Sequence, residues 1–406
     1  SGDTVSIPSG VTLANAGTAT GFASIDWQST VVTGATHTAS ANQGIWINTT
    51  SNACNLTLPS SPSVGDQLIF SDFLRTWGSN AVTLTLNGSK FQGNTSPAPV
   101  YDTAGETVHI VYSGSTQGWI PINDGAVTFE TPQTYAIDYL VIAGGGSGGT
   151  VYNSGGGGAG GFRTSTQTLN TGTSITITVG DGGAAVSTGG SAGGNSGSNS
   201  SISGTGLTTI TSAGGGAAGA RDSAGANGGS GGGGSSGSSA GAGGSGNTPS
   251  TSPSQGNDGG DSSISAPAYA GGGGGGAGAV GADATSSASG NGGNGTASSI
   301  TGSSVTRAGG GGGNAQPGIA AGSGGTGGGG AGNSDNATAT SGTANTGGGG
   351  GGARAGTTSG AGGKGVIILS MPDADYSGTT TGSPTVATGV SGKTVLTFTG
   401  TGSYTT

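Results

Sequence analysis

The chain has 406 residues, of which 100 are glycine and only 6% are charged, and its formal net charge is −9. Its eight basic residues never cluster, so the sequence predicts no nucleic-acid partner. No apolar run approaches the roughly 18–20 residues that span a bilayer, so it also predicts no membrane insertion.

The first predicted element is a short N-terminal attachment segment, residues 1–22. It contains Asp3-Thr-Val-Ser-Ile-Pro-Ser-Gly10 followed by Ala16-Gly-Thr-Ala-Thr-Gly-Phe22. This combination is similar to a motif of tail-associated proteins of marine phages. The resemblance implies that the segment joins the protein to other tail-fibre or baseplate proteins.

Residues 23–127 are predicted to form a separate β-sandwich. Short β-rich runs, such as Gly44-Ile-Trp-Ile-Asn48 and Ala81-Val-Thr-Leu-Thr-Leu86, recur at a spacing of about 8–12 residues. Turn signals such as Asn87-Gly88 separate them. All four tryptophans lie here, so we expect an aromatic core. The domain is similar to the compact β domains of phage tail fibres, which are commonly trimeric, and this resemblance implies a homotrimer.

Most of the glycines lie between residues 141 and 365, in runs such as Gly155–Gly158, Gly271–Gly276 and Gly347–Gly352. Glycine opposes an α-helix by about 1 kcal/mol per residue, and a glycine strand has no side chains to pack. The polyproline II helix suits such runs, because it has about three residues per turn and no internal hydrogen bonds. A disordered linker is the alternative.

Recurring β-like segments favour a folded array over a linker. The strand-like Tyr135-Ala-Ile-Asp-Tyr-Leu-Val-Ile142 and Val366-Ile-Ile-Leu369 flank the glycine-rich block. Inside the block, a Ser-Ser-Ile segment that leads to a new glycine run recurs at 200–202, 262–264 and 298–300. Such recurrence is typical of repeated structural units.

The predicted fold class is therefore all-β plus packed polyglycine or polyproline II helices, with essentially no α-helix. A small β-sandwich is followed by a glycine-rich helical brick on a β base, which spans residues 128–372. The C-terminal β segment, residues 373–406, contains the strand-like Lys393-Thr-Val-Leu-Thr-Phe398. We expect this segment to pack onto the base of the brick or to form a small hairpin.

The glycine-rich block resembles the polyglycine II domain of phage tail-fibre and adhesin proteins. The resemblance covers about residues 135–372. Its motifs are Asp138-Tyr-Leu-Val-Ile-Ala-Gly-Gly-Gly146, Ile177-Thr-Val-Gly-Asp-Gly-Gly183 and Gly362-Gly-Lys-Gly-Val-Ile-Ile-Leu369. The resemblance implies a packed brick whose tip loops contact the bacterial surface.

Catalytic and metal-binding constellations find little support in the sequence. The only histidines are His37 and His109, and Cys54 is the lone cysteine. A Ser-His-Asp triad needs a histidine oriented by a buried acid, and zinc needs three or four nitrogen or sulfur ligands. The segment 256–264 mimics one calcium-binding repeat, but such sites need stacked copies. We therefore predict a protein that is not an enzyme and uses no metal or cofactor.

Counting the runs away from and back to the base predicts which loops lie at the distal tips. The predicted tips include 150–154, 220–226, 247–255, 314–321 and 353–359. Aromatic rings stack on sugars, and amides and charged groups bond their hydroxyls, so tip side chains are candidate receptor contacts. The candidates are Tyr152, Asn153, Arg221, Asp222, Asn247, Pro249, Gln255, Gln316, Ile319 and Arg354. Plain solvated turns are the alternative, since loops carry polar residues in any fold.

The same count places four larger side chains at the base, where a packing role is expected. They are Phe162, Arg163, Tyr269 and Arg307.

The function predicted from the sequence is that of a non-catalytic phage tail-fibre tip or adhesin. It would belong to the virion and act outside the host, binding a cell-surface glycan or an outer-membrane protein through its tip loops. The alternative is a bacterial or environmental surface-fibre or ice-binding glycine-rich protein, although threonines here cluster at turns instead of forming one flat face. A hydrolytic depolymerase comes third, because an acid–base constellation is missing.

Overall fold

The protein divides into two units, Ser1–Thr131 and Pro132–Thr406. The structure is a computed structural model that describes residues 25–126, 134–187, 192–265, 269–335 and 337–406. The predicted attachment segment, residues 1–22, therefore lies outside the described residues. Among the described residues, no helix is long and apolar enough to cross a membrane.

Two β-sheets form the first unit, with strand orders β1-β3-β5-β8-β9 and β2-β4-β6-β7. The strands are β1 (Asp26–Trp27), β2 (Thr36–Thr38), β3 (Gln43–Ile47), β4 (Cys54–Thr57), β5 (Gln67–Asp72), β6 (Val82–Thr85), β7 (Val100–Tyr101), β8 (Glu106–Tyr112) and β9 (Trp119–Ala126). The chain alternates between the sheets from β1 to β6, so β1 to β4 each pair in parallel with the strand two further along. The later strands pair antiparallel.

Period-two burial places one side of each strand in a shared core. In β5, Leu68 and Phe70 are fully buried while the residues between them are partly exposed. The predicted aromatic core contains Trp77 and Trp119, which are both fully buried. Trp27, in contrast, is 41% exposed.

The second unit holds two further antiparallel sheets, with orders β11-β10-β17-β20-β19 and β14-β13-β12-β21-β18, and the hairpin β15-β16. The strands are β10 (Thr134–Ile142), β11 (Phe162–Asn170), β12 (Ser174–Thr178), β13 (Ser200–Ser203), β14 (Ile210–Ser212), β15 (Thr296–Ser298), β16 (Val305–Arg307), β17 (Val366–Pro372), β18 (Thr379–Thr381), β19 (Thr385–Val390), β20 (Lys393–Phe398) and β21 (Gly402–Thr405). A short 3-10 helix, η1, spans Asp373–Asp375. The predicted fold class is confirmed, because the structure is β-rich and essentially without α-helix.

The C-terminal residues 373–406 belong to this second unit. Strand β20 pairs with β17 in one sheet, and β21 pairs with β12 in the other. Leu396, Phe398 and Tyr404 are fully buried in the core between the sheets. The segment is therefore part of the β base that anchors the glycine runs.

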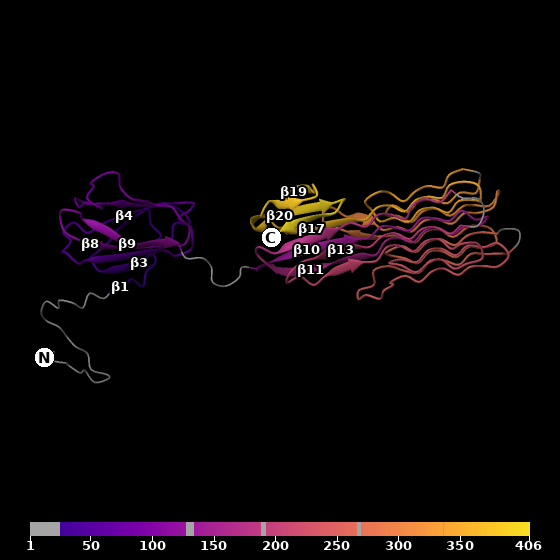
Figure 1. The fold of residues 1–406 in the computed structure, drawn as a ribbon, viewed down its shortest axis with the longest axis horizontal. Helices are drawn as coiled ribbons and strands as arrows, with labels where there is room; N and C mark the ends of the chain where they lie inside the picture. Colours follow the sequence, from indigo (N-terminus) through magenta and orange to yellow (C-terminus); the bar gives the residue numbers. More distant parts are fainter. Residues whose placement is uncertain (1–24, 127–133, 188–191, 266–268, 336) are drawn as a thin grey trace, which may run out of the picture. The chain divides into compact units, whose positions relative to one another are not determined.

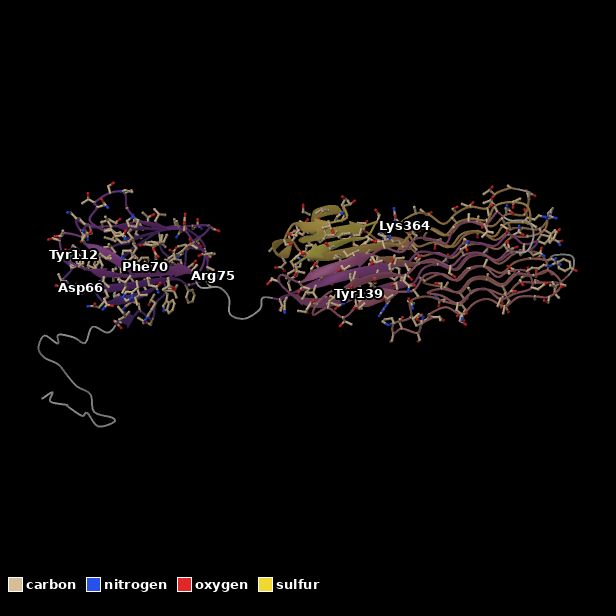
Figure 2. All side chains as sticks on the ribbon, in the orientation of Figure 1. Asp66, Phe70, Arg75, Tyr112, Tyr139 and Lys364 are labelled. Carbon is tan, nitrogen blue, oxygen red and sulfur yellow. The ribbon has the colours of Figure 1, made fainter. Side chains whose placement is uncertain are left out.

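Glycine runs extend side by side from these sheets to the opposite end of the unit (Figure 1). We call the end where the runs meet the strands the base end. The opposite end, formed by loops that include 150–154, 220–224 and 315–319, is the distal end. Few side chains line the runs, and side chains gather again at the distal end (Figure 2).

Hydrogen bonds between runs show the threefold helical geometry directly. Successive N–H groups of the run 155–161 donate to three neighbouring runs in turn. These bonds join Gly156 and Ala159 to the run 271–276, Gly157 and Gly160 to 347–353, and Gly158 and Gly161 to 213–219. Every third residue therefore points to the same neighbour, as a polyproline II helix of about three residues per turn requires.

Close packing of the runs requires glycine because a Cβ atom would overlap a neighbouring backbone. A Cβ on Gly157 would lie 2.1 Å from the Gly146 carbonyl oxygen, and one on Gly349 would lie 1.9 Å from the Gly157 oxygen. These distances are far shorter than van der Waals contact. These positions therefore admit only glycine, and the few side chains buried within the runs are small, such as that of Ser147.

Polar side chains at the outside of the array replace missing backbone acceptors. Asn291 Oδ1 accepts the Ser323 N–H at 2.8 Å, and Asn294 Oδ1 accepts the Thr326 N–H at 3.1 Å. Asp258 likewise accepts a backbone N–H, that of Gly246, at 2.7 Å. Side chains here thus satisfy backbone donors that have no neighbouring run.

Hydrogen-bond partners also fix where the chain turns. The Gly229 N–H donates to the carbonyl of Gly214, the second residue after β14, at the base end. Ser236 donates to Asn153 at the distal end, and Asn247 donates back to Gly229. The chain therefore turns near 227–229 at the base, near 236–240 at the distal end and over 247–255 at the base again.

We expect the packed array to reject even a methyl group. In Gly273→Ala the new Cβ would lie 2.0 Å from the Asn291 oxygen, so we expect a loss of about 3 kcal/mol in the free energy of unfolding. Denaturant unfolding of the purified protein measures this loss. The matched control is Gly400→Ala, where nothing lies within 4 Å of the added atom. Equal stability of the two variants would contradict the packing argument.

Candidate functional site

Side chains from several loops surround a hollow of about 200 Å³ at the distal end. Its lining residues are Tyr152, Asn153, Arg221, Gly237, Tyr269 and Gln316. Tyr152 and Asn153 belong to the first distal loop, and the other residues come from four later loops. The packed runs thus bring together residues that are far apart in the sequence.

The most accessible groups of this distal hollow are an aromatic ring and a cation. Tyr152 is 50% exposed, and the Arg221 guanidinium lies over its ring, 6.0 Å from the centroid. The Arg221 side chain is also largely exposed, and its Nε lies 3.6 Å from Asp222 Oδ2. Exposed cation–ring pairs are worth about 0.5–1 kcal/mol, so this pair orders both side chains without burying them.

Asp222 positions a neighbouring loop instead of facing a ligand. Its Oδ1 accepts the backbone N–H groups of Ser238 at 2.7 Å and Ser239 at 2.8 Å. The Ser239 bond, together with those from Ser238, lowers the pKa of the Asp222 carboxyl. Ionised Asp222 therefore holds the loop 236–240, which contributes Gly237 to the hollow.

Asn153 is a buried structural residue at the floor of the hollow. It is only 2% exposed, and its backbone carbonyl accepts the Ser236 N–H at 3.1 Å. In the amide orientation that satisfies both polar atoms, its side-chain nitrogen donates to Tyr152 O and Tyr269 O, both at 2.9 Å. Asn153 thus ties the two tyrosine-bearing loops together.

The remaining candidates at the distal end are placed as the sequence predicts. Gln316 lines the hollow, and the Ile319 N–H closes a turn onto the Gln316 carbonyl at 3.1 Å. Arg354 follows Ala353, which bridges to Thr150 in the first distal loop. Arg354 does not line the hollow.

The prediction that Asn247, Pro249 and Gln255 form a distal loop is wrong. The Gln255 carbonyl accepts the N–H of Phe162, the first residue of β11, at 2.8 Å, so the loop 247–255 lies at the base end. The Gln255 side chain is 1% exposed, accepts the Ala213 N–H at 2.8 Å and donates to Pro249 O at 2.8 Å. Asn247 folds inward too, because its Oδ1 accepts the Thr251 N–H at 3.0 Å.

An unrecognised turn explains this error. The chain makes a base turn near 227–229 and a distal turn near 236–240, whereas the predicted distal tips at 220–226 and 247–255 allow only one return to the base between them. Up to residues 277–280, each later loop therefore lies at the end opposite to the predicted one. The Ala277 N–H, for example, bonds to the Ala308 carbonyl at the base. Tyr269 consequently lies at the distal end and lines the hollow, although the sequence places it at the base.

Comparison with known proteins identifies one family. Residues 122–372 match the family described as a glycine-rich domain, which covers more than half of the chain. The curated proteins include no match.

The contacts of Gln255 predict a structural role. Gln255→Ala should leave the buried Ala213 N–H without its acceptor, so we expect a loss of about 1–3 kcal/mol in the free energy of unfolding. Thermal and denaturant unfolding measure this effect. Ser250→Ala, an exposed position in the same loop, is the matched control and should change little. A silent Gln255→Ala variant would show that the loop is not held by this side chain.

Removal of the Asp222 carboxylate should loosen the loop 236–240. Because the folded-state pKa is lowered, the carboxylate contributes its bonds above the ordinary aspartate pKa and loses them as pH falls through the folded value. We expect faster hydrogen exchange at the Ser238 and Ser239 amides in Asp222→Ala at neutral pH. Asp181→Ala, whose carboxylate is exposed and paired with Lys364, should leave these amides unchanged.

Proposed function

The chain belongs to the glycine-rich domain family, and on this premise we propose that it is a non-catalytic adhesin that binds a cell-surface receptor through its distal end. The observation that carries the proposal is the distal hollow, where Tyr152, Arg221, Tyr269 and Gln316 converge from separate loops. Tyrosine and arginine are the side chains that most often anchor binding interfaces.

The long sides of the array offer much less for recognition. They consist mainly of glycine, alanine and serine, and their asparagine and aspartate side chains bond to backbone groups of adjacent runs. Those polar groups are already used by the fold. Side chains free to anchor a partner are therefore concentrated at the ends of the runs.

The array also supports the distal loops rigidly. Ser154, which closes the first distal loop, is fully buried, and its hydroxyl donates to the Ala353 carbonyl at 2.6 Å. Asn153 links the Tyr152 and Tyr269 loops in the same region. Loops held in place before binding lose less conformational entropy when a ligand binds, which favours affinity.

The more specific proposal is a phage tail-fibre tip, as the motifs at 138–146 and 362–369 and the segment 1–22 suggest by resemblance. On this proposal the protein is part of the virion and acts at the host cell surface. Other tail-fibre or baseplate proteins would hold its N-terminal part, and the first unit would assemble as a homotrimer. The receptor would be a surface glycan or an outer-membrane protein.

Loss of the two exposed anchors should weaken attachment strongly. We expect Tyr152→Ala combined with Arg221→Ala to weaken adsorption to susceptible cells by about 30-fold or more, since hot-spot side chains contribute about 2 kcal/mol or more. Adsorption of the purified protein to a panel of bacterial cells and envelope fractions measures this. Thermal unfolding should not change, because both side chains are largely exposed.

The matched control is Arg354→Ala, an arginine at the same end that does not line the hollow. It should leave adsorption unchanged. Full adsorption by the double variant would exclude the hollow as the receptor site. Failure of the unmodified protein to bind any envelope fraction would overturn the adhesin proposal itself.

A further inference from the structure

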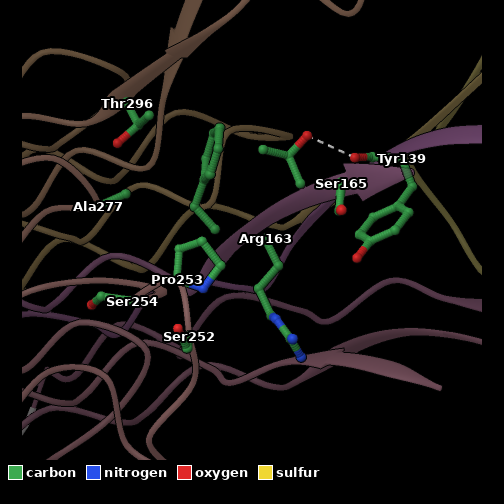
Figure 3. Close-up of a pocket in the computed structure, with 10 residues that line it drawn as sticks. Tyr139, Arg163, Ser165, Ser252, Pro253, Ser254, Ala277 and Thr296 are labelled. Carbon is green, nitrogen blue, oxygen red and sulfur yellow. Dashed lines mark hydrogen bonds between the residues drawn. The ribbon is translucent and has the colours of Figure 1, made fainter. Parts of the chain in front are cut away.

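A second hollow, of about 290 Å³ (Figure 3), is lined by residues of the base end of the array, so it lies at the opposite end of the runs from the distal hollow. Phe162 and Arg163, at the start of β11, form one side of it. The loop that contains Ser252 and Pro253 forms the other side, and Thr296 of β15 completes it. The loop 247–255, which the sequence predicts at the distal end, thus forms part of a hollow at the base end that the sequence does not predict.

Arg163 gives this base hollow an unpaired positive charge. Its Nη1 donates to the Thr211 carbonyl at 3.2 Å, which leaves most of the guanidinium donors available. In the described part of the chain, no carboxylate lies within ion-pair distance of Arg163, whereas Arg221, Lys364 and Lys393 each have one. An anionic group entering the hollow would therefore meet an uncompensated cation.

The rest of the lining combines hydroxyl groups with an apolar face. Within the described residues, the hydroxyls of Ser165, Ser252 and Thr296 make no side-chain hydrogen bond, so they are free to bond a ligand. Phe162 and Pro253 supply the apolar face, and Figure 3 shows Arg163 extending beside Pro253 and Ser252. Such a lining suits a compact ligand with both hydroxyl groups and C–H faces.

We propose that the base hollow binds an acidic sugar residue of a polysaccharide, with its carboxylate at Arg163. The planar guanidinium matches a carboxylate in a charge-assisted, bidentate pair. The sugar hydroxyls would bond the free serine and threonine hydroxyls, while the C–H face of the ring would lie against Pro253 and Phe162. A volume near 300 Å³ is at the small end for ligand sites and suits one or two sugar rings.

Another hollow adjoins the base hollow, so a polymer could occupy both. Thr164 and Ser165 also line an adjoining hollow of about 300 Å³, whose other walls include Ser298 and Ser299. Asp138 also lines it, but Lys393 Nζ lies 2.6 Å from Asp138 Oδ2 and neutralises this carboxylate. A neighbouring sugar would thus find hydroxyl partners and no net repulsion, so an oligosaccharide should bind more tightly than a single acidic sugar.

This proposal is independent of the distal receptor site, and calorimetry on the full chain tests it directly. The probe is trigalacturonic acid, with maltotriose as the uncharged comparison and galacturonic acid as the single-ring comparison. We expect the trimer to bind more tightly than the single ring and maltotriose to bind weakly or not at all. Raised salt should weaken the acidic ligands, since the main contact is an ion pair.

Two variants address the hollow by different means. Arg163→Gln removes the charge and should weaken trigalacturonate binding at least tenfold. Ser252→Leu keeps the guanidinium and adds bulk to the wall that Ser252 lines, and it should also weaken binding, so the test does not depend on one variant remaining folded. Arg354→Gln is the matched charge control at the distal end and should bind as the unmodified protein does.

Three outcomes would overturn the proposal. The first is that trigalacturonate does not bind at millimolar concentration. The second is that the Arg163→Gln and Ser252→Leu variants, shown to unfold normally, both bind trigalacturonate as tightly as the unmodified protein does. The third is loss of binding in Arg221→Gln but not in Arg163→Gln, which would assign the acidic ligand to the distal hollow and support the proposed function instead.

Discussion

Backbone-to-backbone contact between glycine residues is the constraint on which the second unit depends. A polyproline II helix makes no hydrogen bonds within itself, so an isolated glycine run has no reason to adopt this conformation over others. Its N–H groups are satisfied only when neighbours approach in three directions, as they do around the run 155–161. Each run is therefore stable because the others are present. The strands β10, β17 and β20 anchor the array at its base, where they bury ordinary apolar side chains.

This way of packing leaves only few and small side chains in the interior of the array, and the larger ones outside it have different tasks. At the outer sides, Asn291, Asn294 and Asp258 accept backbone N–H groups that lack a neighbouring run. At the ends, some side chains still accept backbone N–H groups, as Asp222 and Gln255 do, whereas others such as Tyr152 extend into solvent. An array made of backbone can therefore be stiff and still present a varied surface, provided that the variation is confined to its ends.

The sequence predicts which segments are strands and which are polyproline II helices better than it predicts where the chain turns between the two ends of the array. The β-branched residues of β10 and β17 identify these strands, and unbroken glycine identifies the helices between them. The turn near 227–229 has no comparable signal, because glycine adopts a turn as readily as an extended helix and no strand interrupts the stretch 228–246. Because this one turn is missed, the sequence predicts Asn247 at the distal end and Tyr269 at the base, whereas each lies at the other end. The role of Gln255 could not be found in the sequence at all, since a buried polar bridge and a solvated loop residue have the same composition.

The two-ended path also limits how such a protein can change. A loop at either end can lengthen or change its side chains while the runs keep their neighbours, because each loop only has to join two adjacent helices. A run, in contrast, can be gained or lost only together with a second one. Each run crosses the array once, so one extra run would bring the chain to the opposite end and move every later loop to the wrong end. The strands β10 and β17, which both meet their glycine runs at the base, fix this requirement. Loops such as those of Tyr152 and Arg221, at which we propose receptor binding, can therefore change at almost no cost in packing, whereas the number of runs is tightly constrained.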